Sequence, residues 1–342
     1  MFGPPPLPRT LEASLRDLGS AKPEVRASAI QDLVRHARKD DDVRAQALPR
    51  VEARLDDEHP GVRAAAAVAL GDLGASDRLP KLLLTMDDDD AHVRQMAINA
   101  LGEIGDPRAA PRLRRALGDD RPEVRYQAII ALSRVCEDDE EIEQAIARAT
   151  RDGDDAIVHI ALRLAEERID EGHPASDEIL ARARALRESA SPHVALVAAI
   201  LLAKAGDDAG HDLVLRVVKG ERIRGQAPDK EDEQAAVELA GELGMKAAVP
   251  YLERRAWGVA RWVRDTAPFH ARIALARMGH ARAIAEILAD LESGKRDVVS
   301  AAVVAAGRAR LVKARETIAR LSTAAVDPDL VKEALARLET AP

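Results

Sequence analysis

The chain has 342 residues and a formal net charge of −8, and only 2% of its residues are aromatic whereas 32% are charged. A core without aromatic side chains must be built from Ala, Leu, Val and Ile, which favours closely packed helices over a sandwich or barrel. The single cysteine, Cys136, excludes a disulfide framework and a thiolate metal cage.

The N-terminal residues 1–8, MFGPPPLP, predict a disordered proline-rich lead. They lack the basic and apolar regions of a secretory signal, and no apolar run in the chain approaches the ~18 residues of a membrane span. We therefore expect a soluble, cytoplasmic protein. Residues 11–18 then predict a helix that caps the structure following it.

From about residue 20 onward the sequence repeats itself. A Val-Arg pair followed by an Ala-Leu-Gly-like segment occurs at Val62, Val93 and Val124, which lie 31 residues apart. Weaker and irregular copies continue through residues 150–235 and beyond. Because self-similarity at such a period indicates a repeat architecture, we predict a single solenoid over residues 9–342.

Within one unit the apolar residues follow a helical period. Four of them recur at steps of four, four and three and therefore share one helix face: Val93, Ala97, Leu101 and Ile104. Gly105 is expected to end this helix, because glycine adopts the left-handed C′ conformation without strain. Residues 107–117 then predict a second helix. Each unit is thus expected to be two antiparallel helices of about three turns, whose apolar stripes become buried only when neighbours stack.

The whole map contains nine such helix pairs, whose first helices are expected to start near residues 24, 60, 91, 121, 154, 191, 231, 258 and 296. Residues 327–338 predict a closing helix. Two places depart from the regular repeat. A polar insertion marked by Gly and Pro occupies residues 219–230, and a helix about one turn longer than its counterparts is expected over residues 261–278.

The segment Val93–Pro107 follows the pattern Val-Arg-x-x-Ala-x-x-Ala-Leu-Gly-x-Ile-Gly-Asp-Pro. This pattern resembles the HEAT repeat, in its short phycobilisome-lyase HEAT-like form, and the resemblance covers about residues 20–340. It implies an all-α fold, a right-handed α-α superhelix of the armadillo type, with first helices on the convex side and second helices on the concave side. It also implies a scaffold or binding surface as the mode of action.

Charge is distributed unevenly. Residues 246–342 carry 17 Lys and Arg against 11 Asp and Glu, whereas residues 1–245 carry 34 against 48. The acidic residues gather in the turns between helices. We expect them to cap the helices that follow, and the alternative is that they form an acidic surface for a basic partner. One arginine recurs at the same place in successive units, and we expect it to bond an aspartate of the adjacent turn: Arg26, Arg63, Arg94 and Arg125.

Four of the six aromatic residues fall within 19 residues of the basic part: Tyr251, Trp257, Trp262 and Phe269. They either fill the core of a wider repeat or contribute to a surface. Trp and Arg are enriched in binding hot spots, and an arginine can stack on an indole ring. The predicted partner-binding patch consists of Arg254, Arg255, Trp257, Arg261, Trp262 and Arg264.

No catalytic constellation is found in the sequence. The nine histidines form neither a His-Glu dipeptide nor an H-x-x-x-H pair, and there is no phosphate-binding glycine loop and no G-x-S-x-G elbow. Cys136 stands at a structural position of its repeat and is expected to be a packed small residue. We therefore predict no catalytic residue, no cofactor and no metal ligand.

These features predict a non-catalytic scaffold or adaptor that presents a curved solenoid surface to another protein, whose identity the sequence does not reveal. One alternative is a nucleic-acid-binding or DNA-glycosylase-like HEAT protein that uses the basic Trp and Arg patch. The other is a bilin-lyase-like chaperone. The net negative charge argues against nucleic acid as the partner.

Overall fold

The computed structural model describes residues 9–258, 267–321 and 326–339. Contacts between residues divide the chain into two compact units, Met1–Glu167 and Arg168–Pro342. Apart from one isolated bridge between Ile223 and Gln226, the regular structure of the described residues is helical throughout. The prediction of an all-α fold built from stacked helix pairs is confirmed.

The first ten helices are α1 (Leu11–Asp17), α2 (Pro23–Ala37), α3 (Asp41–Glu52), α4 (Pro60–Asp72), α5 (Leu79–Thr85), α6 (Ala91–Ile104), α7 (Ala110–Ala116), α8 (Pro122–Val135), α9 (Asp139–Ala149) and α10 (Asp155–Asp170). The other ten are α11 (Asp177–Leu186), α12 (Pro192–Lys204), α13 (His211–Lys219), α14 (Lys230–Glu242), α15 (Val249–Trp257), α16 (Ala267–Arg277), α17 (Ala281–Leu291), α18 (Arg296–Arg308), α19 (Arg315–Ala319) and α20 (Pro328–Glu339).

The even-numbered helices from α2 to α18 are the first helices of the pairs. Eight of the nine predicted starts lie within one residue of an observed start, and α1 and α20 are the expected capping and closing helices. The ninth start, near residue 258, precedes residues outside the described part of the chain, as does the beginning of the long helix expected over residues 261–278.

The second helices α5 and α7 are shorter than the three turns expected. Each has seven residues and follows a 3₁₀ turn, Ser76–Arg78 before α5 and Pro107–Ala109 before α7. A proline at the second position of each helix, Pro80 or Pro111, favours this arrangement. Because proline has no N–H, the α-helical hydrogen bonds do not extend back through it, and the preceding residues form the tighter turn.

The first helices approach one another very closely. A Cβ atom built on Gly71 of α4 would lie 2.7 Å from Cα of Ala100 on α6, so only glycine fits there. The same contact recurs in the second unit, where a Cβ on Gly241 of α14 would lie 2.4 Å from Cα of Ala274 on α16. The Ala-Leu-Gly segments of the sequence are therefore sites of helix packing, whereas Gly105 ends α6 with a φ of 70°, as predicted.

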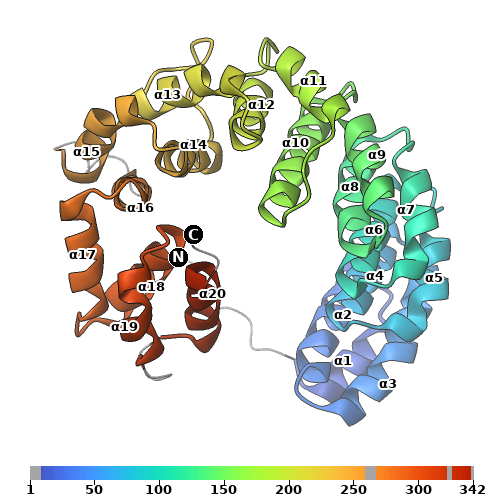
Figure 1. Cartoon of the computed structure of the whole chain (residues 1–342). Coiled ribbons are helices and arrows are strands. Elements are labelled where there is room, and N and C mark those ends of the chain that lie inside the picture. Colours follow the sequence, from blue (N-terminus) through green and yellow to red (C-terminus); the bar gives the residue numbers. More distant parts are fainter. Residues whose placement is uncertain (1–8, 259–266, 322–325, 340–342) are drawn as a thin grey trace. The chain divides into compact units, whose positions relative to one another are not determined.

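This packing corrects the expected placement of the two helix layers. In the second unit α14, α16 and α18 lie on the inner side of the bend, and α13, α15 and α17 lie on the outer side (Figure 1). The first helices therefore line the concave side of this unit, contrary to the expectation. Gly241 and Gly307 bring these first helices close to their neighbours, through contacts with Ala274 and Ala334, as a position on the inner side of a bend requires.

A continuous hydrophobic core runs through the second unit from Ala195 to Leu338, and Tyr251, Trp257 and Phe269 pack against its edge. The insertion at residues 219–230 includes Ile223, which is buried in this core. Among the described residues, none of the helices has the length and apolar character that crossing a membrane requires.

Candidate functional site

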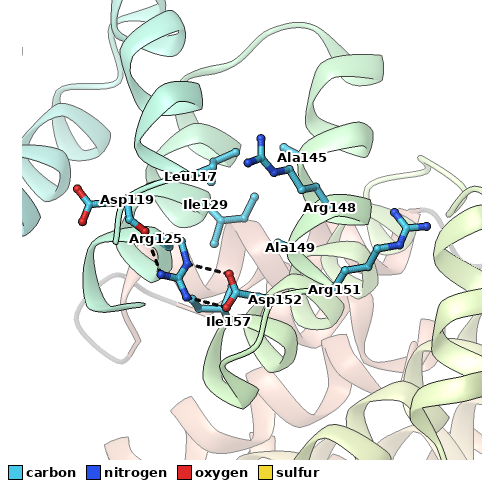
Figure 2. Close-up of a pocket in the computed structure, with 11 residues that line it drawn as sticks. Leu117, Asp119, Arg125, Ile129, Ala145, Arg148, Ala149, Arg151, Asp152 and Ile157 are labelled. Carbon is cyan, nitrogen blue, oxygen red and sulfur yellow. Dashed lines mark hydrogen bonds and ion pairs between the residues drawn. The ribbon is translucent and has the colours of Figure 1, made fainter. Parts of the chain in front are cut away.

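The repeated arginines form a ladder that joins successive first helices. Each is the fourth residue of its helix and pairs through two nitrogens with an aspartate of the next turn, at a closest distance of 2.6 to 2.9 Å: Arg26–Asp57, Arg63–Asp88, Arg94–Asp119 and Arg125–Asp152. Figure 2 shows the last of these pairs, with both Asp152 oxygens facing the Arg125 guanidinium. The predicted pairing of these arginines with the adjacent turn is confirmed.

Every rung of this ladder has the same further bonds. Nη1 of Arg94 donates to the carbonyl of Asp88 at 3.1 Å, and the other three arginines make the corresponding bond in their own turns. Each ladder aspartate also accepts from the backbone N–H two residues later, as Asp119 does from Arg121 at 2.9 Å. The arginine of each rung thus bonds the turn before its own helix, and the aspartate bonds the turn in which it lies. Each rung therefore fixes two successive turns.

The bonds of the ladder alter the pKa values of its groups. Burial alone would raise the pKa of Asp119, but the hydrogen bonds from Arg94 and from the backbone outweigh it, and the pKa lies below its usual range. At Asp152 the hydrogen bond from Arg125 is the largest cause, and the pKa is likewise lowered. These carboxylates are therefore ionised at neutral pH and have a structural role.

Other turn aspartates cap helices, as expected. Asp40, Asp90 and Asp138 each accept from backbone N–H groups in the first turn of the following helix. Of the remaining acidic groups in these turns, Asp56 pairs with Lys81 at 2.6 Å, and Asp120 is largely exposed. Capping thus accounts for these three acidic turn residues of the first unit, and the ladder accounts for four others.

A pocket of about 420 Å³ lies beside the last rung, between the ends of α7, α8, α9 and α10 (Figure 2). Its apolar part is formed by Leu117, Ile129, Ala145, Ala149 and Ile157. Arg148 points across its mouth from α9, and the Arg125–Asp152 pair forms one wall (Figure 2). The pocket combines a shallow apolar floor with groups that are already paired, and it contains no nucleophile beside a general base.

The predicted partner-binding patch is described only in part. Arg261, Trp262 and Arg264 lie outside the described residues. Arg254, Arg255 and Trp257 stand on the last turn of α15, and the structure gives each of them different surroundings.

Arg255 faces into the protein. Its guanidinium donates to the carbonyls of Val217 and Val218 at 2.7 and 2.8 Å and pairs with Glu233 at 2.7 Å, and only 11% of its side chain is exposed. These bonds tie the end of α13 and the start of α14 to α15. Arg255 therefore positions α15 and offers little of its own charge to a partner.

Arg254 is exposed and lies over the ring of Tyr251, with its guanidinium carbon 5.2 Å from the ring centroid. Lys219 lies over the same ring at 5.7 Å. Tyr251 therefore holds two cations close together at the outer side of the second unit.

Trp257 is half-buried and is held by three side chains, which come from α17 and from the residue that precedes this helix. Its Nε1 donates to Glu286 at 2.9 Å, the imidazole of His280 packs with a centroid distance of 5.3 Å, and the guanidinium of Arg282 lies 4.2 Å from the indole centroid. Trp257 thus packs against the core and also keeps exposed surface.

Glu286 orients this cluster. Burial alone would raise the pKa of Glu286, but the hydrogen bonds from Trp257 and Arg282 outweigh it and the pKa is lowered. The sequence prediction missed His280, Arg282 and Glu286. Their spacing of 23 to 29 residues from Trp257 is close to one repeat length, and this offset between neighbouring second helices is the signal that marks them.

Cys136 is partly buried, and burial raises the pKa of its thiol, which makes it a weak nucleophile. This is consistent with the packed role expected from its repeat position.

Comparison with known proteins agrees with this architecture. Residues 9–91 and 79–165 match the family model of HEAT repeats. No curated protein matches the sequence significantly. Among solved structures, YibA of Escherichia coli is similar, with 17% identity, a TM-score of 0.54, and coverage of 79% of this chain and 92% of its own.

Two further structures are similar at lower TM-scores. The complex of CpcE and CpcF of phycocyanin lyase from a Nostoc species has 20% identity and a TM-score of 0.44, and the match covers 74% of this chain and 95% of that one. An engineered protein has 16% identity and a TM-score of 0.43, with coverage of 97% and 99%. Residues 9–165 therefore consist of HEAT repeats, and stacked helix pairs of the same kind continue through the second unit.

Proposed function

We propose that this HEAT-repeat protein is a non-catalytic scaffold that binds another protein through a patch on the second unit. The patch is centred on Trp257 and includes Arg254, together with the predicted residues Arg261, Trp262 and Arg264. Arg255 contributes to it by positioning α15. The observation that carries the proposal is the fixed, half-exposed indole of Trp257 with the Arg282 guanidinium on its face.

The chemistry of this patch favours a partner with apolar and acidic side chains. Aromatic rings held in one orientation bury a large area without losing much conformational entropy, and tryptophan and arginine dominate binding hot spots. Arg254 and Arg282 are both exposed, and residues 246–342 carry an excess of basic residues. Stacked guanidinium groups keep N–H donors free at their edges for a carboxylate.

The Figure 2 pocket holds no nucleophile beside a general base, which agrees with a binding role. The groups that line the Figure 2 pocket are paired aspartates, arginines and aliphatic side chains. A solenoid of stacked pairs supplies an extended surface for contact, which is the usual use of such an architecture.

The test is affinity capture with the full chain as bait, comparing variants by quantitative mass spectrometry. Trp257→Ala is expected to reduce the main captured protein at least tenfold. Because Trp257 also packs on the core, Arg254→Glu with Arg282→Glu provides a second variant at exposed positions, and it is expected to have the same effect. Val312→Ala is the control, since Val312 is an exposed apolar residue of the same unit with 56% exposure.

Unchanged capture by both patch variants would contradict the proposed patch. A DNA gel shift at ~50 mM salt that weakens steeply with added salt would instead favour the nucleic-acid alternative.

A further inference from the structure

Three metal-ligating side chains meet in the second unit, where α12 and α14 begin. They are His193 near the start of α12, Asp229 at the N-cap of α14 and Asp232 in the first turn of α14. One ligand atom from each lies within 4.8 Å of the other two. Asp229 is also the point at which the insertion over residues 219–230 joins α14.

Asp229 does not use its carboxylate as the other N-cap aspartates do. Its backbone has the extended N-cap conformation, with φ −62° and ψ 154°, yet its side chain makes no capping hydrogen bond. Other aspartates at N-caps accept from the backbone of the following turn, among them Asp40, Asp90, Asp106, Asp138 and Asp207. A carboxylate that forgoes such a bond, which stabilises a helix by about 1 kcal/mol, has another attraction.

The group that lies beside the Asp229 carboxylate is the imidazole of His193. Oδ2 of Asp229 lies 2.9 Å from Nδ1 of His193, but the two atoms lack the alignment of a hydrogen bond, and Nδ1 is buried without any hydrogen-bond partner. Buried polar atoms are nearly always satisfied, so an unpartnered imidazole nitrogen beside a carboxylate oxygen needs an explanation. Two donor atoms that converge without bonding to each other are the arrangement that a shared cation requires.

Asp232 supplies the third ligand atom. It lies three residues after Asp229, so both side chains project from the same face of the first turn of α14. Asp232 is only 2% exposed, so its carboxylate is held inside the protein. The site thus combines one buried carboxylate, one exposed carboxylate and one imidazole.

We propose that His193, Asp229 and Asp232 bind a divalent transition-metal ion of the zinc type. An imidazole nitrogen with two carboxylate oxygens suits zinc better than magnesium or calcium, which prefer oxygen ligands alone. Ligand atoms around tetrahedral zinc lie about 3.3 Å apart, given bond lengths of 2.0 to 2.1 Å. The distance of 2.9 Å from Nδ1 of His193 to Oδ2 of Asp229 is close to this value, and the Asp229 side chain, which is 68% exposed, has room to adjust.

Such an ion joins two neighbouring repeats and holds the end of the insertion against α12. It replaces the expectation from the sequence that the chain has no metal ligand. The sequence does not mark the proposed site, because the three residues come from segments 36 residues apart, in no spacing that a metal motif uses. Three protein ligands leave one tetrahedral position for water.

The experiment is a competition titration of the chelator-treated full chain with ZnCl₂ against a chromophoric zinc indicator. We expect the unaltered chain to bind one Zn²⁺. We expect His193→Gln and Asp229→Asn to bind this ion at least tenfold more weakly. His211→Gln is the matched control, because His211 also lies beside an aspartate at a helix start, Asp208 at 3.3 Å, without a third ligand. This variant is expected to bind as the unaltered protein does.

Thermal unfolding followed by circular dichroism provides the second measurement. One equivalent of Zn²⁺ is expected to raise the Tm of the unaltered protein and of His211→Gln, and to leave His193→Gln and Asp229→Asn unchanged. Asp229 is exposed, so its variant reports on binding even where substitution of the more buried groups weakens folding. Equal zinc binding by all variants overturns the proposal, as does equal competition by Mg²⁺ or Ca²⁺.

Discussion

Removal of one rung of the arginine ladder tests how the first unit is held together. Arg94 lies in the middle of the stack, and its Nε and Nη2 atoms donate to the two oxygens of Asp119, each at 2.9 Å. Only 14% of the Arg94 side chain and 15% of the Asp119 side chain are exposed. In Arg94→Ala, the Asp119 carboxylate loses its cation and the Asp88 carbonyl loses a donor.

The magnitude follows from this burial. Breaking a fully buried ion pair costs about 3–5 kcal/mol, whereas exposed pairs contribute at most about 1 kcal/mol. The Arg94 pair is mostly buried, so we expect a loss of about 3 kcal/mol in the free energy of unfolding. For a unit of this size, that corresponds to a decrease of about 6–12 °C in Tm.

Arg108→Ala is the matched control. Arg108 also pairs through two nitrogens with an aspartate, Asp106, but the partner is two residues away and 68% of the Arg108 side chain is exposed. We expect a loss of at most about 1 kcal/mol. Urea unfolding followed by circular dichroism at 222 nm compares the variants. Equal losses for Arg94→Ala and Arg108→Ala would refute the structural role of the ladder.

Three other predictions concern stability and reactivity. Gly241→Ala is expected to lower the unfolding free energy by about 2 kcal/mol, because its Cβ would lie 2.4 Å from Cα of Ala274, whereas Gly153→Ala, with no atom within 4 Å, should change it little; thermal unfolding distinguishes them. The lowered pKa values of the ladder aspartates predict that their stabilisation is complete above about pH 4 and is lost as the pH falls through the folded-state values, so acid titration should remove the difference between Arg94→Ala and the unaltered protein. Cys136, whose thiol pKa is raised by burial, should react with iodoacetamide at pH 8 more slowly than after denaturation, and equal rates would contradict its packed environment.

The helix starts and the ladder could be predicted because both are local or periodic in the sequence. A proline or a capping aspartate marks the start of most first helices, and the arginine recurs with an aspartate in the following turn. The placement of the layers in the second unit could not be predicted in this way, because it depends on contacts between neighbouring repeats, such as the close approach of Gly241 to Ala274.

The candidate site was less accessible from the sequence. The acceptors of Arg255 are the backbone carbonyls of Val217 and Val218, and no side-chain pattern marks a carbonyl. The sequence showed the cluster of aromatic residues, but it did not show the partners of Trp257, because these come from the next repeat. The grouping of His193 with Asp232 arises only when α12 and α14 pack together.

The fourth residue of the first helix has one further consequence. It is arginine in α2, α4, α6 and α8, but it is Ala195 in α12 and Val299 in α18. A forked guanidinium bond holds its partner at one distance and angle, whereas contact between small aliphatic groups tolerates sliding. We therefore expect the contacts made by α2, α4, α6 and α8 to yield less under load than those of α12 and α18, where Ala195 and Val299 replace the guanidinium.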